Sequence, residues 1–146
     1  MRAPFQILAI PYRRNKDSIL FCAFRRSDSD LWQFIAGGGE DSETPSEAAK
    51  REIYEESGIE CSDLISLTSM CYLPVTIFPM LKNYNWQKDT YVIPEYAFGF
   101  ECNEDISLSR EHTECVWMTY EKAKEILAYD SNKTAMYELF RRLTAI

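Results

Sequence analysis

Apolar runs rich in β-forming residues are separated by short polar stretches near the start of the chain. Two of these runs, 5–12 and 18–24, flank the polar stretch 13–17 and are expected to form a pair of adjacent strands. A third run, 32–36, is stopped by Gly37, Gly38 and Gly39. Because glycine tolerates conformations closed to other residues, we expect the backbone to turn sharply there.

The segment from Thr44 to Gly58 has the pattern of a helix with both ends marked. Thr44 fits the N-cap, Pro45 the first helical position, and Glu47 completes a capping box three residues after the cap. Gly58 is placed to close the C-terminus. A narrow apolar stripe within this segment supplies the buried face.

The second half of the chain continues the interleaving of strands and helices. Strands are predicted over 64–73, 91–101 and 115–119, and amphipathic helices over 121–127 and 133–143, with a polar, aromatic loop over 82–89. No repeat or linker divides the chain. The pattern therefore predicts a single α/β domain over residues 1–146 with a mixed β-sheet.

Composition narrows the function classes. The net charge of −7 argues against a general surface for nucleic-acid polymers or anionic membranes, which would need a basic patch. No apolar run reaches the roughly 20 residues that span a bilayer, and the start of the chain lacks the features of a signal peptide. The five scattered cysteines have no zinc-knuckle or redox spacing. Free thiols and a cytoplasmic location are the expectation.

Three glutamates on the predicted helix form the candidate chemical site. Glu55 and Glu56 lie three and four residues after Glu52, so the three carboxylates share one helix face. At about 5 Å and an effective dielectric near 20, each like-charged pair costs on the order of 3 kcal/mol before solvent relaxation. Such a cluster is either a solvated acidic surface or a site for a divalent cation such as Mg²⁺, which prefers hard oxygen ligands.

The surrounding spacing favours the metal site. The order is glycine, five residues, glutamate, seven residues, then Arg-Glu-apolar-any-Glu-Glu-any-Gly-apolar, matched by Gly37, Glu43, Arg51, Glu52, Ile53, Glu55, Glu56, Gly58 and Ile59. This segment resembles the signature of the Nudix hydrolases. The resemblance implies an α/β/α sandwich and a Mg²⁺-dependent pyrophosphatase, with Mn²⁺ able to substitute.

The resemblance also implies roles for individual residues. Glu52, Glu55, Glu56 and the Gly37 backbone would bind metal, and Arg51 would orient the carboxylates through charge-assisted hydrogen bonds. Glu43 and Gly38 would support the loop. Glu52 is one candidate for the general base that takes a proton from the attacking water.

Residues outside the signature resemble those of a Nudix subgroup, the bacterial dihydroneopterin triphosphate pyrophosphatases. The shared features are an Arg-Arg pair before Trp32-Gln33, Glu111-His112 before a late strand, and Ser131-Asn132 near the last helices. By position, Glu111 would be a further metal ligand or base, and Arg2, Arg25 and Ser131 would contact substrate. Two residues depart from the pattern: Ala36 replaces a hydroxyl residue and Ser42 replaces a glycine.

Several alternatives stay open at this level. The arginines could be solvated, His112 is interpreted as structural or as support for a ligand, and Tyr84 and Trp86 could either stack on a heterocycle or anchor their loop. The leading hypothesis is release of pyrophosphate from a pterin or nucleoside triphosphate. ADP-ribose, nucleotide sugars or dinucleoside polyphosphates are alternative substrates, and a non-catalytic nucleotide sensor is a second alternative. The partner is expected to be a small di- or triphosphate, and the protein a monomer or homodimer.

Overall fold

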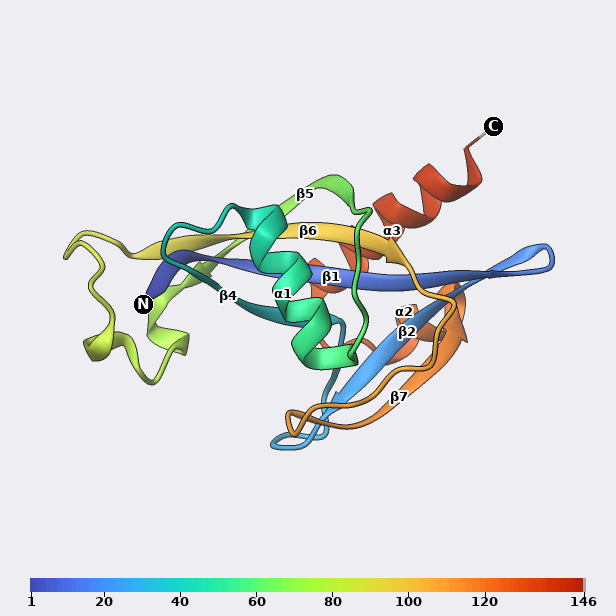
Figure 1. Ribbon diagram of the computed structural model, residues 1–146, viewed down its shortest axis with the longest axis horizontal. Helices are drawn as coiled ribbons and strands as arrows, with labels where there is room; N and C mark the ends of the chain where they lie inside the picture. The colour runs from blue at the N-terminus through green and yellow to red at the C-terminus, as the bar shows by residue number, and fades with distance from the viewer. Residues whose placement is uncertain (146) are drawn as a thin grey trace.

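The protein is an α/β/α sandwich built on one mixed sheet. The computed structural model describes residues 1–145, so Ile146, the last residue of the predicted domain, lies outside the described residues. Within these residues, seven strands pair in one sheet (Figure 1). They are β1 (Arg2–Asn15), β2 (Ser18–Arg26), β3 (Trp32–Gln33), β4 (Ile35–Glu40), β5 (Ile65–Pro74), β6 (Val92–Glu101) and β7 (His112–Thr119).

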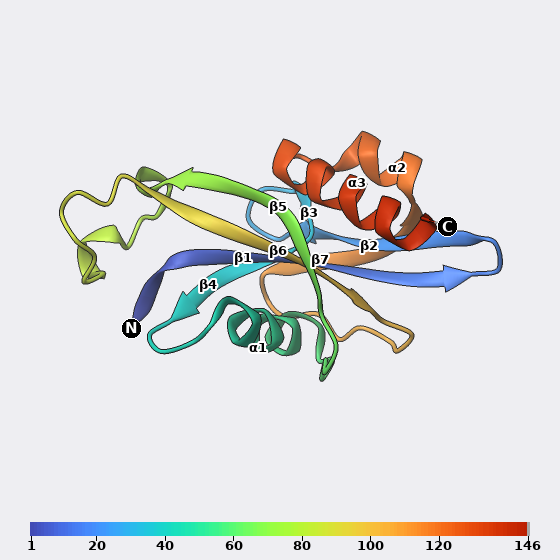
Figure 2. The same ribbon diagram turned by 90° about the horizontal axis from the view of Figure 1, so that it is seen from above.

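Helices cover both faces of the sheet. Helix α1 (Pro45–Ser57) lies on one face, and α2 (Tyr120–Ile126) and α3 (Asp130–Thr144) lie on the other (Figure 2). Two short 3₁₀ turns, Val75–Ile77 and Leu81–Asn83, interrupt the connection between β5 and β6. The expected fold class, a mixed sheet between helical layers, is confirmed.

Strand β1 is the centre of the sheet and is buried on both faces. It pairs in parallel with β6 and antiparallel with β2 and β4. Because side chains alternate along a strand, Ile7 and Ala9 pack in the cluster under α1, whereas Leu8 and Ile10 pack in the cluster under α3. This double burial explains the nearly continuous apolar run that marks β1 in the sequence.

Helix α1 has the ends that the sequence predicts. The Thr44 side chain accepts a hydrogen bond from the Glu47 backbone, the Glu47 carboxylate accepts one from the Thr44 N–H, and Gly58 adopts a left-handed conformation with φ of 75°. These contacts fix where the helix begins, and hence which of its glutamates face the sheet.

The expected turn at Gly37, Gly38 and Gly39 is wrong. These glycines lie within β4, where Gly37 pairs with Ile7 and Gly38 with Gln6. None of the three has a positive φ, whereas Ser42, in the turn that follows, has φ of 74°. The run of glycines is needed because side chains of Glu52, Arg2 and Phe5 occupy the places where Cβ atoms would lie.

Strand β5 forms one edge of the sheet and has an irregular register between Ser66 and Met70. The Glu138 carboxylate of α3 accepts hydrogen bonds from the backbone N–H groups of Thr68 and Ser69, each at 2.7 Å. Arg142 donates to the same carboxylate at 2.8 Å. One side chain therefore satisfies donors at the irregular part of the strand and ties α3 to the sheet edge.

Within residues 1–145, none of the helices combines the length and the apolar character needed to cross a bilayer.

Candidate functional site

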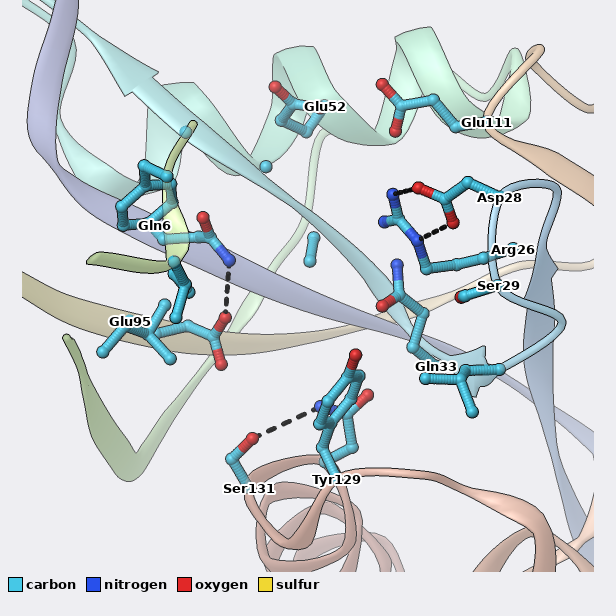
Figure 3. Close-up of a pocket in the computed structure, with 18 of the residues that line it drawn as sticks. Gln6, Arg26, Asp28, Ser29, Gln33, Glu52, Glu95, Glu111, Tyr129 and Ser131 are labelled. Atoms are coloured by element: carbon cyan, nitrogen blue, oxygen red, sulfur yellow. Dashed lines mark hydrogen bonds and ion pairs between the residues drawn. The ribbon is translucent and has the colours of Figure 1, made fainter. Parts of the chain in front are cut away.

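A cavity of about 740 Å³ opens beside α1 and contains most of the predicted site residues. Glu52 and Glu55 of α1 and Glu111, just before β7, supply its carboxylates, and Arg2 and Arg26 supply cationic groups. The segment after β5 and the start of α3 form further parts of the lining. Figure 3 shows Glu52 and Glu111 on one side, with Glu95, Ser131 and Tyr129 across the cavity. The lining includes the predicted Gly37, Gly38 and Ser131 and also Ala36.

Gly37 makes room for the Glu52 carboxylate. A Cβ atom at Gly37 would lie 2.2 Å from Glu52 Cδ, closer than any real contact allows. The glycine therefore lets the carboxylate lie directly against the backbone of β4, where it is only 8% exposed. Burial raises the pKa of Glu52 to about 7, although the hydrogen bond from Arg51 acts in the opposite direction.

The Arg51 side chain connects α1, the glycine-containing strand β4 and the carboxylates of the site. Its guanidinium donates two hydrogen bonds to Glu43, at 2.8 and 3.0 Å, and one to the Gly38 carbonyl at 2.8 Å. It also donates to Glu52 at 2.9 Å and to Glu55 at 3.2 Å. The bidentate pair lowers the pKa of Glu43. Glu43 in turn accepts from the Glu40 N–H at 2.8 Å, so it ties the end of β4 to α1.

Glu56 does not line the cavity itself; it lies in a buried polar cluster next to Glu111. Its carboxylate lies 2.9 Å from Nδ1 of His112 and accepts a hydrogen bond from the Ser109 hydroxyl at 3.1 Å. Burial works against its charge, but hydrogen bonds from His112, Glu111 and Ser109 together lower its pKa. His112 thus supports a carboxylate from within the protein, in agreement with its interpretation as a supporting residue.

Glu111 connects this buried cluster to the cavity. Burial raises its pKa, and the hydrogen bond and negative charge of Glu56 raise it further. Its backbone carbonyl accepts from Ser27 at 2.9 Å, which fixes it beside the loop after β2. The pair therefore holds two carboxyl groups close together, an arrangement stabilised by a shared proton or by a cation.

Arg2 lies beside β4, and its guanidinium is held by aromatic rings. A Cβ at Gly38 would lie 2.2 Å from Arg2 Cζ, so this glycine also makes room for a side chain. The guanidinium stacks over the Phe78 ring at 4.6 Å and lies 5.7 Å from the Tyr84 ring centre. Trp86 donates its indole N–H to the Arg2 carbonyl at 2.9 Å, so in this structure it anchors its loop.

The two adjacent arginines of β2 have different environments. The predicted substrate contact, Arg25, does not line the cavity; it forms ion pairs with Asp30 at 3.0 Å and Glu114 at 3.5 Å. Arg26 does line it, paired with Asp28 at 2.7 Å. Successive side chains of a strand point to opposite faces, so only one of the pair can face the cavity.

Sequence reasoning missed Gln6 and Glu95, and it named Asn132 only within the Ser131-Asn132 resemblance, without a role. Asn132 is buried and accepts a hydrogen bond from the Phe34 N–H at 2.9 Å, fixing the start of α3 against the break between β3 and β4. Gln6 and Glu95 line the cavity and hydrogen-bond to each other at 3.0 Å. Their signal was present: each is a polar residue inside an otherwise apolar strand, which indicates a buried polar contact.

Glu52, Glu55 and Glu111 form an acidic wall of the cavity, and their oxygen ligands fit a divalent cation. Hard carboxylate oxygens from α1 and from the segment before β7 are present, and one of them, Glu52, is nearly buried in the space left by Gly37. Within residues 1–145, however, no three His, Cys, Asp or Glu side chains already converge closely enough to hold a metal ion. Glu52 is bonded to Arg51 and Glu56 to His112, so these pairs would have to adjust on binding.

The charges of the cavity suit an anionic, extended ligand. Carboxylates that can recruit a cation lie on one wall, and the guanidinium groups of Arg2 and Arg26 lie elsewhere in the lining. Phosphate groups bind well between metal ions and arginine side chains. The remaining length of the cavity, bordered by apolar and aromatic residues, has the character of a small-molecule pocket.

Comparison with known proteins shows what the whole chain is similar to. The family model described as the NUDIX domain matches residues 4–143. A dihydroneopterin triphosphate diphosphatase of Haemophilus influenzae is 27% identical over 133 residues, covering 89% of this chain and 83% of the relative. A structure assigned to the NUDIX hydrolases from Listeria monocytogenes has a TM-score of 0.84 and 43% identity, covering 97% of this chain and 94% of that one.

A further structure, the dihydroneopterin triphosphate pyrophosphohydrolase of Escherichia coli, has a TM-score of 0.74 at 23% identity. The alignment covers 95% of this chain and 97% of that one. At this identity, the likeness shows the shared fold.

Proposed function

The chain belongs to the Nudix hydrolase family, and from that premise we propose that it is a Mg²⁺-dependent pyrophosphohydrolase. Its substrate would be a pterin or nucleoside triphosphate, cleaved at a phosphoanhydride bond by water with release of pyrophosphate. The similarity to a dihydroneopterin triphosphate diphosphatase over most of the chain supports this choice among the family's substrates.

One observation carries the proposal. The carboxylates of Glu52, Glu55 and Glu111, from two separate segments, line a single cavity that also contains Arg2 and Arg26. A solvated acidic helix face would not bury Glu52 against a glycine or place Glu111 beside Glu56. The arrangement suits recruitment of a cation and a polyphosphate to the same place.

Glu52, Glu55, Glu56 and Glu111 would hold Mg²⁺, with the Gly37 backbone as a further candidate ligand and Mn²⁺ as a possible substitute. When bound, the ion supplies neutralisation of phosphate charge and Lewis-acid polarisation of the phosphoryl oxygens.

Side chains of the protein itself would orient the carboxylates, bind the phosphates and accept a proton. Arg51 holds the carboxylates of Glu52 and Glu55 in place through its hydrogen bonds. Arg2 and Arg26 would bind phosphate oxygens, for which Arg26 has to exchange its partner Asp28. Glu52 and Glu111 both face the cavity, so either carboxylate could accept the proton of the attacking water at its oxygen.

The first test is product analysis. Pyrophosphate and orthophosphate release are measured with Mg²⁺ for dihydroneopterin triphosphate, the common nucleoside triphosphates, ADP-ribose and a dinucleoside polyphosphate. We expect pyrophosphate from the triphosphates. Turnover confined to ADP-ribose or the dinucleotide would contradict the proposed substrate class, and tight binding without turnover would indicate a sensor.

The second test addresses the residues. Glu52→Gln, Glu56→Gln and Glu111→Gln should each lower kcat by on the order of 10²-fold or more, because each removes a negative charge from the acidic site. Glu60→Gln, just beyond α1 and exposed, is the matched control and should be unchanged. Unchanged turnover in all three site variants, with folding verified by circular dichroism, would refute the proposed metal site.

A further inference from the structure

Glu95 is a buried acidic residue that the proposed hydrolysis does not use. It lies in the middle of β6, is 6% exposed, and lines the same cavity as Glu52 and Glu111. The sheet register places it directly between Gln6 of β1 and Cys71 of β5. Gln6 donates to one carboxylate oxygen at 3.0 Å, and the Cys71 thiol donates to the other at 3.4 Å.

The orientation of Gln6 is fixed by Arg2. The Arg2 guanidinium donates to the Gln6 carbonyl oxygen at 2.9 Å, so the amide nitrogen of Gln6 must face Glu95. The Arg2 guanidinium in turn stacks on the Phe78 ring and occupies the space that a side chain at Gly38 would fill. The series of hydrogen bonds from Arg2 through Gln6 thus holds the Glu95 carboxylate in one defined orientation.

The hydrogen-bonding capacity of Glu95 is incompletely used. A carboxylate has about four lone-pair positions, and two are occupied by Gln6 and Cys71. Among residues 1–145, no cationic side chain forms an ion pair with it. A buried carboxylate without a cation is costly unless further N–H donors reach it, and the open side of Glu95 faces the cavity (Figure 3).

The surroundings of Glu95 suit a flat heterocycle. Leu73 near the end of β5, and Ile77 and Phe78 in the segment that follows it, contribute apolar surface to the cavity. In Figure 3, Glu95 lies across the cavity from Glu52 and Glu111, so a ligand whose phosphates lie at the acidic wall can extend its other end toward Glu95. An apolar slot with one oriented polar group is typical of heterocycle recognition.

We propose that Glu95 determines specificity by accepting two adjacent N–H donors from a 2-amino-4-oxopyrimidine ring, the edge shared by guanine and pterin. This inference rests on the proposed function and assigns its substrate class. The ring N–H and the neighbouring exocyclic amino group match the two oxygens of one carboxylate. Adenine and cytosine instead present an amino donor beside a ring acceptor, which a carboxylate does not satisfy.

The sharpest test compares GTP with ITP, which differ only in the 2-amino group. The wild-type protein should prefer GTP over ITP in kcat/KM by about tenfold or more. With ITP, the Glu95 oxygen that accepts from the 2-amino group has no donor. Glu95→Gln replaces one acceptor oxygen with an N–H₂ donor. It should lower kcat/KM for GTP by about 10- to 100-fold and bring the GTP to ITP ratio close to one.

Controls separate specificity from structure. Glu101→Gln, an exposed residue on the same strand, should leave the ratio unchanged. If Glu95→Gln lowers GTP, ITP and ATP by the same factor, Glu95 is structural and the inference is overturned. A wild-type ratio near one overturns it without any variant. Dihydroneopterin triphosphate, measured in parallel, shows whether pterin or guanine is the better source of this edge.

Binding of phosphate-free ligands distinguishes failure of this inference from failure of the proposed function. Calorimetric titration with guanosine, inosine and neopterin needs no hydrolysis. Equal binding of guanosine and inosine in a protein that hydrolyses triphosphates would overturn the inference alone. Discrimination between them that is lost in Glu95→Gln, in a protein that hydrolyses no triphosphate, would overturn the proposed function alone.

Discussion

At the scale of single residues, the glycines of β4 are determined by what lies against them. Gly37 accommodates the Glu52 carboxylate and Gly38 the Arg2 guanidinium. Neither has a positive φ, so alanine is compatible with the backbone at both positions. The constraint is space, and it connects each glycine to one functional side chain.

This connection predicts different outcomes for two neighbouring substitutions. Gly37→Ala should displace Glu52 and lower kcat by about 10²-fold, because the carboxylate can no longer lie against β4. Gly38→Ala should displace Arg2 and mainly raise KM. Steady-state kinetics with thermal unfolding as a folding control checks both. Equal changes in kcat and KM for the two variants would contradict the assignment.

At the scale of elements, the contact between α3 and the edge strand β5 depends on Glu138. Burial works against its charge, but hydrogen bonds from Ser69, the Thr68 and Ser69 backbone and Arg142 lower its pKa to about 2. The carboxylate supplies acceptors where the β5–β6 register is irregular. Without it, backbone N–H groups of β5 would lose their partner.

Glu138→Ala should therefore lower the free energy of unfolding by about 2 kcal/mol at pH 7. The folded-state pKa lies below the ordinary value of 4.5. The stabilisation is therefore complete above about pH 4.5, and it is lost as the pH falls toward 2. Urea unfolding of both proteins at several pH values should show the difference narrowing over that interval.

Glu125→Gln, an exposed site on α2, is the control for Glu138→Ala and should change stability by less than about 0.5 kcal/mol. A Glu138→Ala difference that stays constant from pH 7 to pH 3 would show that packing, and not the charge, carries the contact.

At the scale of the whole molecule, the acidic side chains are gathered on a protein that already has a net charge of −7. Glu52, Glu55, Glu56 and Glu111 belong to two segments brought together by the fold, and among the described residues Arg51 forms ion pairs with Glu52 and Glu55. A cation that binds the folded state alone would stabilise the entire domain.

Adding Mg²⁺ to metal-free protein should accordingly raise Tm. At a concentration 100-fold above Kd the gain is about 2.7 kcal/mol, or about 5–10 °C for a domain of this size. EDTA should reverse the shift. Differential scanning calorimetry of Glu52→Gln should show most of the shift lost, whereas Glu60→Gln should retain it. An equal shift in wild type and Glu52→Gln would place the ion elsewhere.

The sequence by itself determined the elements whose signals are local. The caps of α1, the strand pair at the start of the chain and the shared face of Glu52, Glu55 and Glu56 depend on residues within a few positions of one another. The family signature added the Arg51 and Glu43 contacts that the structure contains. The position of Glu111 in the sequence indicated a site residue, but it did not indicate that Glu111 pairs with Glu56.

Only the tertiary structure decided the features that depend on strand register and side-chain direction. Alternation along β2 brings Arg26 and not Arg25 to the cavity, and pairing across three strands places Glu95 between Gln6 and Cys71. The local pattern at the glycines of β4 predicts a turn and not a strand, because the side chains that need their space come from distant segments. Such contacts join residues far apart in the chain, so no local pattern specifies them.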